Sequence, residues 1–139
     1  MIYHYVILKV IMMKDHLGIV CSGLCIIHCI ATPFILGLGI TGVLASVLAT
    51  ELIHLLLLLP ITTLIILTVP TAYIRYRSVN LVITALLGMI FLIGALLLEE
   101  DLEVLLTVIG GSLLVMFHLW NLHLYKKTNR AMAADSTVS

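Results

Sequence analysis

Four long apolar runs, separated by short polar segments, dominate the hydrophobic pattern of this chain. A helix needs about 20 apolar residues to cross the hydrocarbon core of a bilayer, and each run is close to that length. We therefore expect an all-α fold, an integral membrane bundle of four transmembrane helices. The expected spans are Leu17–Gly39, Leu52–Ile74, Leu81–Leu98 and Leu102–Leu122.

The ends of the chain mark the limits of a single membrane domain. Residues 1–14 are apolar but too short to cross a bilayer, so they predict a juxtamembrane N-terminal segment. Residues 15–127 form the predicted four-helix membrane domain. Residues 128–139 are polar, and we expect them to form a disordered C-terminal tail.

The basic residues assign an orientation to this bundle. If the chain crosses the membrane four times, every lysine and arginine falls on the same side. Because these residues concentrate in cytoplasmic loops, both termini are predicted to be cytoplasmic. The charges in question are Lys9, Lys14, Arg75, Arg77, Lys126, Lys127 and Arg130.

Composition supports a membrane protein and narrows the classes of function. Of the 139 residues 63% are hydrophobic and 10% are charged, whereas soluble domains average about 25% charged residues. The formal net charge is zero and no basic block occurs, so we expect lipid and not nucleic acid as a partner. No constellation of nucleophile, base and acid stands out, and an enzyme is not expected.

The candidate chemistry lies in the first span, which holds all three cysteines of the chain. On a helix, Cys21, Cys25, His28 and Cys29 fall within an arc of about 100°. Thiol and imidazole groups are the ligands that Hg(II), Cu(I) and Zn(II) prefer. An odd number of cysteines on one helix is no disulfide framework, so we expect free thiols.

We call these four side chains the cysteine–histidine stripe, and spacing alone leaves two interpretations of it open. Cys25 and Cys29 are four residues apart, which places their Cβ atoms about 5–6 Å from each other. A two-coordinate ion such as Hg(II) would fit between their sulfur atoms. Cysteine is also a small hydrophobic residue that packs well inside a bundle, and the spacing favours packing and metal binding about equally.

Other polar side chains at membrane depth form a possible secondary site. His118 and Asn121 share one face of the fourth span and could face the first span across the bundle. For His118, a hydrogen bond to Asn121 or to a threonine is slightly favoured over direct ligation of a metal. His54 and Glu51, at the start of the second span, form either a point where ions enter or an interfacial capping pair.

The motif Asp15-x-x-Gly18-x-x-x-Ser22-x-Leu24-Cys25-x-x-His28-Cys29-x-x-x-Pro33 resembles the first helix of MerC-domain membrane proteins, the mercury-resistance transport family. His54…Pro60 and Gly111-Ser112…His118-x-x-Asn121 are similar to later parts of the same domain. The resemblance covers roughly Lys14 to Lys127. It implies a multi-pass inner-membrane protein that takes up Hg(II) by relay between thiols.

In that resemblance Cys25 and Cys29 are the acceptor pair, and Cys21 is an additional thiol. Mercury-resistance members carry further cysteines near the C-terminus, whereas this chain has none after Cys29. The absence of these C-terminal cysteines leaves open how the ion would pass to a cytosolic thiol acceptor. It leaves Zn(II) and Cu(I) as alternative ions, with His28 as a ligand.

The leading functional prediction is a carrier of a soft heavy-metal cation, most of all mercuric ion, with no permanently bound cofactor. The alternatives are a membrane metal-binding or thiol sensor that transports nothing, for zinc or copper, and a structural subunit whose cysteines only pack. Four helices of this size barely enclose a pathway, which leaves room for a homo-oligomer.

Overall fold

The computed structural model describes the backbone of residues 2–39, 42–43, 51–98 and 100–136. Over these ranges the chain forms long helices and no strand, which confirms the predicted all-α bundle of four helices. The helices are α1 (Ile2–Gly37), α3 (Glu51–Tyr76), α4 (Val79–Ala95) and α5 (Glu100–Ser136).

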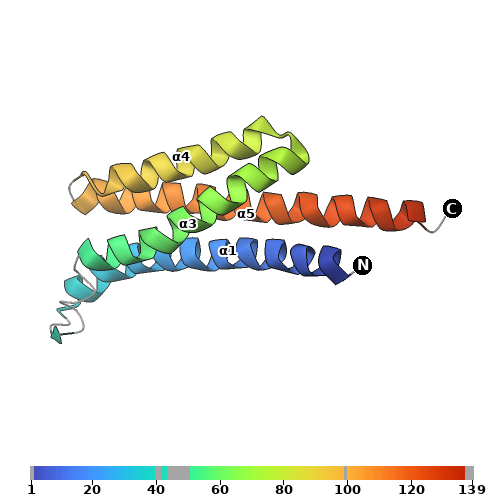
Figure 1. The fold of residues 1–139 in the computed structure, drawn as a ribbon. Helices are drawn as coiled ribbons and strands as arrows, with labels where there is room; N and C mark the ends of the chain where they lie inside the picture. Colours follow the sequence, from blue (N-terminus) through green and yellow to red (C-terminus); the bar gives the residue numbers. More distant parts are fainter. Residues whose placement is uncertain (1, 40–41, 44–50, 99, 137–139) are drawn as a thin grey trace.

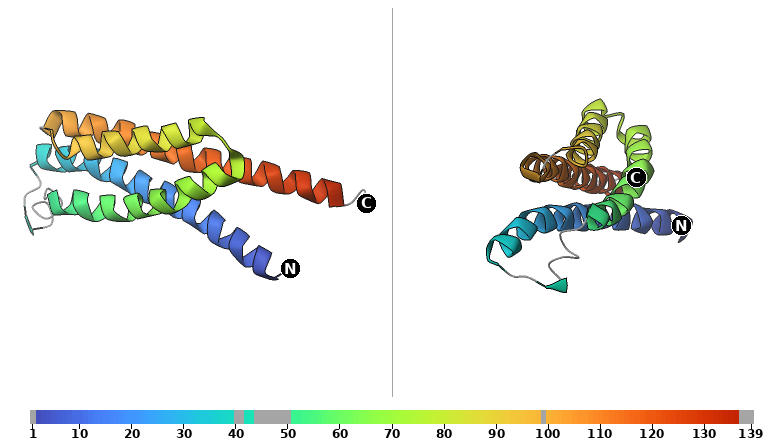
Figure 2. Two further views of the ribbon diagram at one scale, coloured as in Figure 1. Left: turned by 45° about the horizontal axis from the view of Figure 1, so that its top comes forward. Right: turned by 90° about the vertical axis from the view of Figure 1, so that its left-hand side faces the viewer.

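Each helix packs against the one before it and the one after it in the sequence, and α5 returns to pack against α1. Figures 1 and 2 show the resulting up-and-down arrangement, with α4 and α5 side by side along much of their length. The two chain termini lie at the same end of the bundle (Figure 1). An even number of membrane crossings places both termini at the same end, which agrees with the orientation predicted from the basic residues.

Three helices contain segments long and apolar enough to cross a membrane, namely Met12–Gly37, Leu55–Tyr76 and Leu102–Ala131. The fourth, α4, is apolar but has only 17 residues, a length of about 25 Å. The first crossing segment begins at Met12 and not at the expected Leu17. Asp15 therefore lies inside this segment, where side chains of α5 form hydrogen bonds to its carboxylate.

The helices at both ends of the chain extend into the segments that the sequence predicts to lie outside them. α1 begins at Ile2, so the juxtamembrane segment is continuous with the first membrane helix. α5 continues to Ser136, and most of the tail expected to be disordered is helical. Residues 128–136 contain three alanines and neither glycine nor proline, a composition that favours helix. The Arg75 side chain also donates a 3.4 Å hydrogen bond to Asn129 Oδ1.

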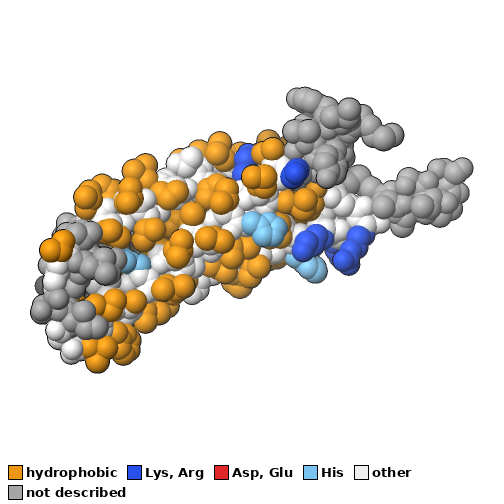
Figure 3. Space-filling model, turned by 90° about the horizontal axis from the view of Figure 1, so that it is seen from below, with side chains coloured by type: hydrophobic (Ala, Val, Ile, Leu, Met, Phe, Trp, Pro, Cys, Tyr) orange, Lys and Arg blue, Asp and Glu red, His pale blue; other side chains and the backbone are white. Residues whose placement is uncertain are grey.

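Apolar side chains cover the outside of the bundle as well as its core. Leucine, isoleucine and valine side chains on all four helices are exposed, as expected of a surface that faces lipid tails. On the face shown in Figure 3, the lysine and arginine side chains lie toward one end and the remainder is largely hydrophobic. The core includes both Cys25 and Cys29.

Glycine allows the closest approach between α4 and α5. A Cβ on Gly110 would lie 2.8 Å from the carbonyl oxygen of Gly88, and a Cβ on Gly88 would lie 2.7 Å from Leu114 Cδ2. These distances are shorter than real Cβ contacts. Small residues of this kind let membrane helices pack with their backbones in contact.

Candidate metal-thiol site and buried polar network

The Cys25 and Cys29 side chains face the interior of the bundle. They are 4% and 2% exposed, and both cysteines are free. The Cys25 thiol is close enough to Cys29 to form a hydrogen bond with it. The two sulfur atoms thus form a pair one helical turn apart, shielded from lipid by α3, α4 and α5.

The other two members of the predicted stripe lie to the side of this pair. Cys21 is half-buried and packs against the core. His28 is also half-buried, and its backbone carbonyl accepts a 2.8 Å hydrogen bond from the Thr32 hydroxyl. Within the described residues no three histidine, cysteine, aspartate or glutamate side chains are grouped to hold a metal ion. The geometry offers two ligands at the pair and no preformed cage.

Cys25 also lines a small pocket at which all four helices meet. The pocket has a volume of about 10 Å³, which is room for about one water molecule. α5 contributes a carboxylate, since Glu103 in its first turn lines the pocket. In Figure 1 this end of α5 lies opposite the chain termini. The remaining lining residues are Leu58, Leu92, Ala95, Leu96 and Thr107.

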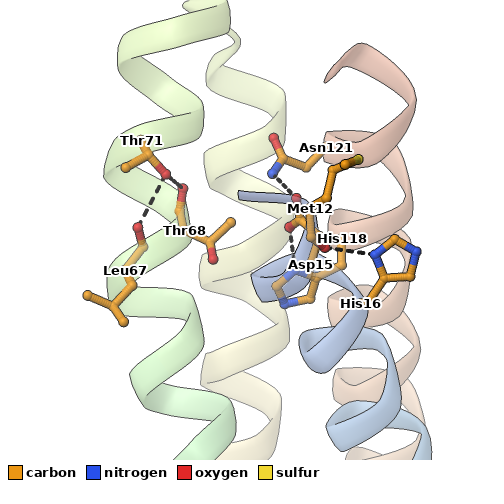
Figure 4. Close-up of polar contacts among 8 residues, drawn as sticks. All are labelled: Met12, Asp15, His16, Leu67, Thr68, Thr71, His118 and Asn121. Carbon is orange, nitrogen blue, oxygen red and sulfur yellow. Dashed lines mark hydrogen bonds and ion pairs between the residues drawn. The ribbon is translucent and has the colours of Figure 1, made fainter. Parts of the chain in front are cut away.

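The most polar part of the interior lies nearer the termini, where α1 meets α5. Asp15 is 0% exposed, and its two carboxylate oxygens accept hydrogen bonds from two side chains of α5. His118 Nδ1 lies 2.9 Å from Oδ1, and Asn121 Nδ2 lies 2.7 Å from Oδ2. Figure 4 shows Asp15 between these two partners. We call Asp15, His118 and Asn121 the polar network.

Glycine and phenylalanine shape the space around the His118 ring. A Cβ on Gly18 would lie 2.5 Å from His118 Cδ2 and closer still to Nε2 and Cε1, so only glycine leaves room for the imidazole. Phe117 packs edge-on against His118, with ring centroids 4.9 Å apart. The Asp15-x-x-Gly18 and His118-x-x-Asn121 motifs are thus complementary parts of one interhelical contact.

This contact answers the prediction for His118 and Asn121. Both are buried and contact Asp15 of the first span. The hydrogen-bonding partner of His118 is Asp15 and not Asn121 or a threonine, and ligation of a metal by His118 stays a prediction. His54 and Glu51 belong to the start of α3, but their side chains lie outside the described residues.

Asp15 belongs to the first-span motif but is not among the candidate site residues predicted from the sequence. A signal was present in the spacing, because Asp15, Gly18, Ser22, Cys25 and Cys29 recur every three or four residues and are all buried. This spacing marks one helix face that includes the carboxylate.

Comparison with known proteins identifies the pattern shared by these motifs. A family model described as the MerC mercury resistance protein matches residues 15–123, a range that begins at Asp15 and includes the thiol pair and the polar network. The chain has no significant match among curated proteins or solved structures.

Proposed function

The chain belongs to the MerC family of mercury-resistance proteins, and on this premise we propose that it carries Hg(II) across the membrane by ligand exchange at the thiols of Cys25 and Cys29. Its apolar helices and its family make it a multi-pass membrane protein. We also propose, as parts of this function, that the protein transports the ion, that the ion is Hg(II) and that the protein lies in the inner membrane.

The observation that carries the proposal is the buried pair of free thiols. Two sulfur ligands facing each other suit an ion that prefers linear two-coordinate binding, as Hg(II) does. Zn(II) takes four ligands in nearly all protein sites, and no third or fourth ligand is grouped with the pair within the described part of the chain. The geometry therefore favours Hg(II) over Zn(II).

Capture of the ion is a substitution without any change of oxidation state. Two S–Hg bonds form, two bonds from mercury to its earlier ligands break, and the two thiol protons leave. Glu103 at the pocket beside Cys25 supplies a negative charge that attracts a cation toward the thiols. Release is the reverse substitution, in which two incoming thiols replace Cys25 and Cys29 in turn; each incoming thiol loses its proton, and each cysteine thiolate regains one.

The direction of transport in this proposal follows from the charges. The junction between α3 and α4 and the C-terminal part of α5 lie toward the bundle end that holds both termini (Figure 1). These segments carry Arg75, Arg77, Lys126 and Lys127, and the positive-inside rule places that end in the cytoplasm. Cys25 and the pocket are nearer the opposite end. Ions would enter there, and cytosolic thiols would remove them at the end that holds the termini.

The test compares mercury accumulation in cells that express matched variants. We expect the Cys25→Ser/Cys29→Ser double variant to lower accumulation, and the sensitivity of the cells to mercury, to the level of cells without the protein. Cys21→Ser is the matched control because it removes a half-buried thiol of the same helix; it should retain most of the uptake. Equal accumulation by the double variant and the wild type would refute transport.

Proteoliposomes separate a carrier from a sensor. The carrier moves Hg(II) into vesicles that contain a trapped thiol, whereas the sensor binds metal in detergent and gives no flux. Replacement of all three cysteines without loss of function would instead identify a structural subunit in which the thiols only pack.

A further inference from the structure

A closely packed length of α1 and α5 separates the thiol pair from the bundle end that holds the termini. Asp15 and Cys25 are 10 residues apart on α1, which corresponds to about 15 Å along the helix axis. In the proposed function the ion enters from the opposite end, and thiols that arrive from the end holding the termini remove it. Either the ion or the incoming thiol must therefore cross this length inside the bundle.

The first close contact along this length is the one between Gly18 and His118. The His118 side chain is 1% exposed, and a Cβ on Gly18 would lie 2.5 Å from its Cδ2 atom. The imidazole thus occupies the space beside Gly18. A 2.9 Å hydrogen bond to Asp15 and the edge-on contact with Phe117 hold the ring there, so α1 and α5 leave no room for an ion at this level.

The second close contact lies nearer the thiol pair and involves Gly111 on α5. A Cβ on Gly111 would lie 2.7 Å from Ile26 Cγ1 and 3.5 Å from the carbonyl oxygen of Ser22. The two helices therefore touch again between His118 and Cys25. We call Gly18, Ser22, Gly111 and His118 the inner seal.

The free space beside the thiols lies toward the other end of the bundle. The pocket that Cys25 lines also includes Glu103 in the first turn of α5 and Leu96 at the C-terminal end of α4. Both of these helix ends lie opposite the chain termini (Figure 1). The interior thus has a small cavity on the side from which the ion would enter and close packing on the side from which it would leave.

Unpaired polar atoms at the inner seal oppose this closed packing. The Ser22 side chain is 0% exposed, and its hydroxyl has no hydrogen-bond partner among the described residues. On the same helix, by contrast, the Thr32 hydroxyl donates a 2.8 Å hydrogen bond to the carbonyl of His28. Asn121 Oδ1, beside His118, is also buried and has no partner in the described part of the chain.

These atoms give the inner seal two opposing contributions to its stability. A buried hydroxyl or amide oxygen without a hydrogen bond is costly, and the cost disappears once water reaches the atom. Close packing and the hydrogen bond between His118 and Asp15 favour the closed arrangement. Packed helix contacts change between discrete arrangements and do not deform continuously, so a contact balanced in this way is suited to opening as a unit.

On the basis of the proposed function, we propose that the inner seal is a gate between the thiol pair and the bundle end that holds the termini, and that it is closed in this structure. Release of the ion requires α1 and α5 to separate at Gly18 and Gly111. The separation withdraws the His118 ring from Gly18 and admits water to the Ser22 hydroxyl and to Asn121 Oδ1. Incoming thiols then reach Cys25 and Cys29 from that end.

The first test measures how fast a cationic methanethiosulfonate, which does not cross lipid, reacts with Cys25 and Cys29 in sealed vesicles. Cys21→Ser is the parent protein, so that the half-buried third thiol does not contribute. A C-terminal tag that protease removes identifies the side exposed to the reagent. From the side of the termini, His118→Ala should react about tenfold faster than the parent, because the hydrogen bond that favours the closed gate is lost. From the other side the rate should stay unchanged.

Ser22→Ala provides a variant of opposite sign. It removes the unpaired hydroxyl, so the closed gate no longer carries its cost. Added to His118→Ala, it should slow the reaction from the side of the termini about tenfold. Ser112→Ala, at an exposed serine of α5, is the matched control and should leave the rate unchanged.

The second test connects the gate to the ion. Protein loaded with Hg(II) is given glutathione on the side of the termini, and the rate at which mercury leaves is measured at constant pH. Release from Ser22→Ala should be about tenfold slower than from the wild type, whereas Ser112→Ala should release at the wild-type rate.

The outcomes distinguish the gate from the proposed function. A wild type that does not bind Hg(II) at the thiol pair refutes the proposed function, while the thiosulfonate reaction, which needs no mercury, tests the gate by itself. Equal rates for His118→Ala and its parent from the side of the termini refute the gate. Equal acceleration from both sides indicates a loosened bundle and also refutes it. Should His118→Ala fail to fold, release from Ser22→Ala at the wild-type rate refutes the gate, and slower release supports it.

Discussion

Gly18→Ala tests whether the contact between α1 and α5 depends on the absence of a side chain at one position. The added Cβ would lie 2.5 Å from His118 Cδ2 and closer to two other ring atoms. The His118 ring also contacts Phe117 edge-on and is hydrogen-bonded at Nδ1 to Asp15. Either His118 leaves its hydrogen bond, or α1 moves away from α5.

The cost of the clash can be isolated by a matched substitution on the same helix. Overpacking of a filled position costs about 1–3 kcal/mol, whereas replacing glycine by alanine within a helix gains about 1 kcal/mol of helix propensity. Gly23→Ala has the same gain, and a Cβ there meets nothing within 4 Å. The free energies of unfolding of the two variants should therefore differ by about 1–3 kcal/mol, with Gly18→Ala the less stable.

Unfolding in detergent micelles by increasing denaturant provides the measurement, because reaction of the buried thiols Cys25 and Cys29 with a thiol-specific dye reports loss of the bundle. The two alanine variants are compared with the wild type under the same conditions. Equal stability of Gly18→Ala and Gly23→Ala would show that His118 does not pack against Gly18, and the geometry of the polar network would then be wrong.

Two further predictions concern the same helix contacts. In a double-mutant cycle, Asp15→Ala and His118→Ala should each destabilise the bundle, and the double variant should lose about 0.5–3 kcal/mol less than their sum; additive effects would contradict the 2.9 Å contact. Gly110→Ala should be about 1–3 kcal/mol less stable than Gly94→Ala, because a Cβ at Gly110 contacts Gly88 whereas one at Gly94 meets nothing within 4 Å; thermal unfolding of both variants would show this difference.

The number and position of the helices could be predicted from the sequence because a simple physical constraint acts on apolar segments in a membrane. A segment in lipid must satisfy its backbone hydrogen bonds internally, so each long apolar run becomes a helix. The ends of the helices were harder to predict. α1 and α5 extend to Ile2 and Ser136, since a helix continues into water wherever the local residues favour it.

The candidate site was predicted in part. Spacing placed Cys25 and Cys29 together, and the structure buries both of them. Spacing also assigned Cys21 and His28 to the same arc, but a helix face about 100° wide includes side chains at its edges that reach only the boundary of the core. Which members of a stripe are central depends on where the neighbouring helices lie, and no local pattern contains that information.

Asp15 illustrates the remaining limit and shows how it can be reduced. Its partners are 103 and 106 residues away in the chain, so nothing near Asp15 distinguishes a buried carboxylate from one at the membrane surface. The spacing from Asp15 through Gly18 and Ser22 to Cys25 does make that distinction, provided that the helix is assumed to begin before Leu17. A polar residue that continues the buried face of a membrane helix needs a partner on a neighbouring helix. In this chain His118 and Asn121, one turn apart on a similar face of the last span, are the side chains that meet that need.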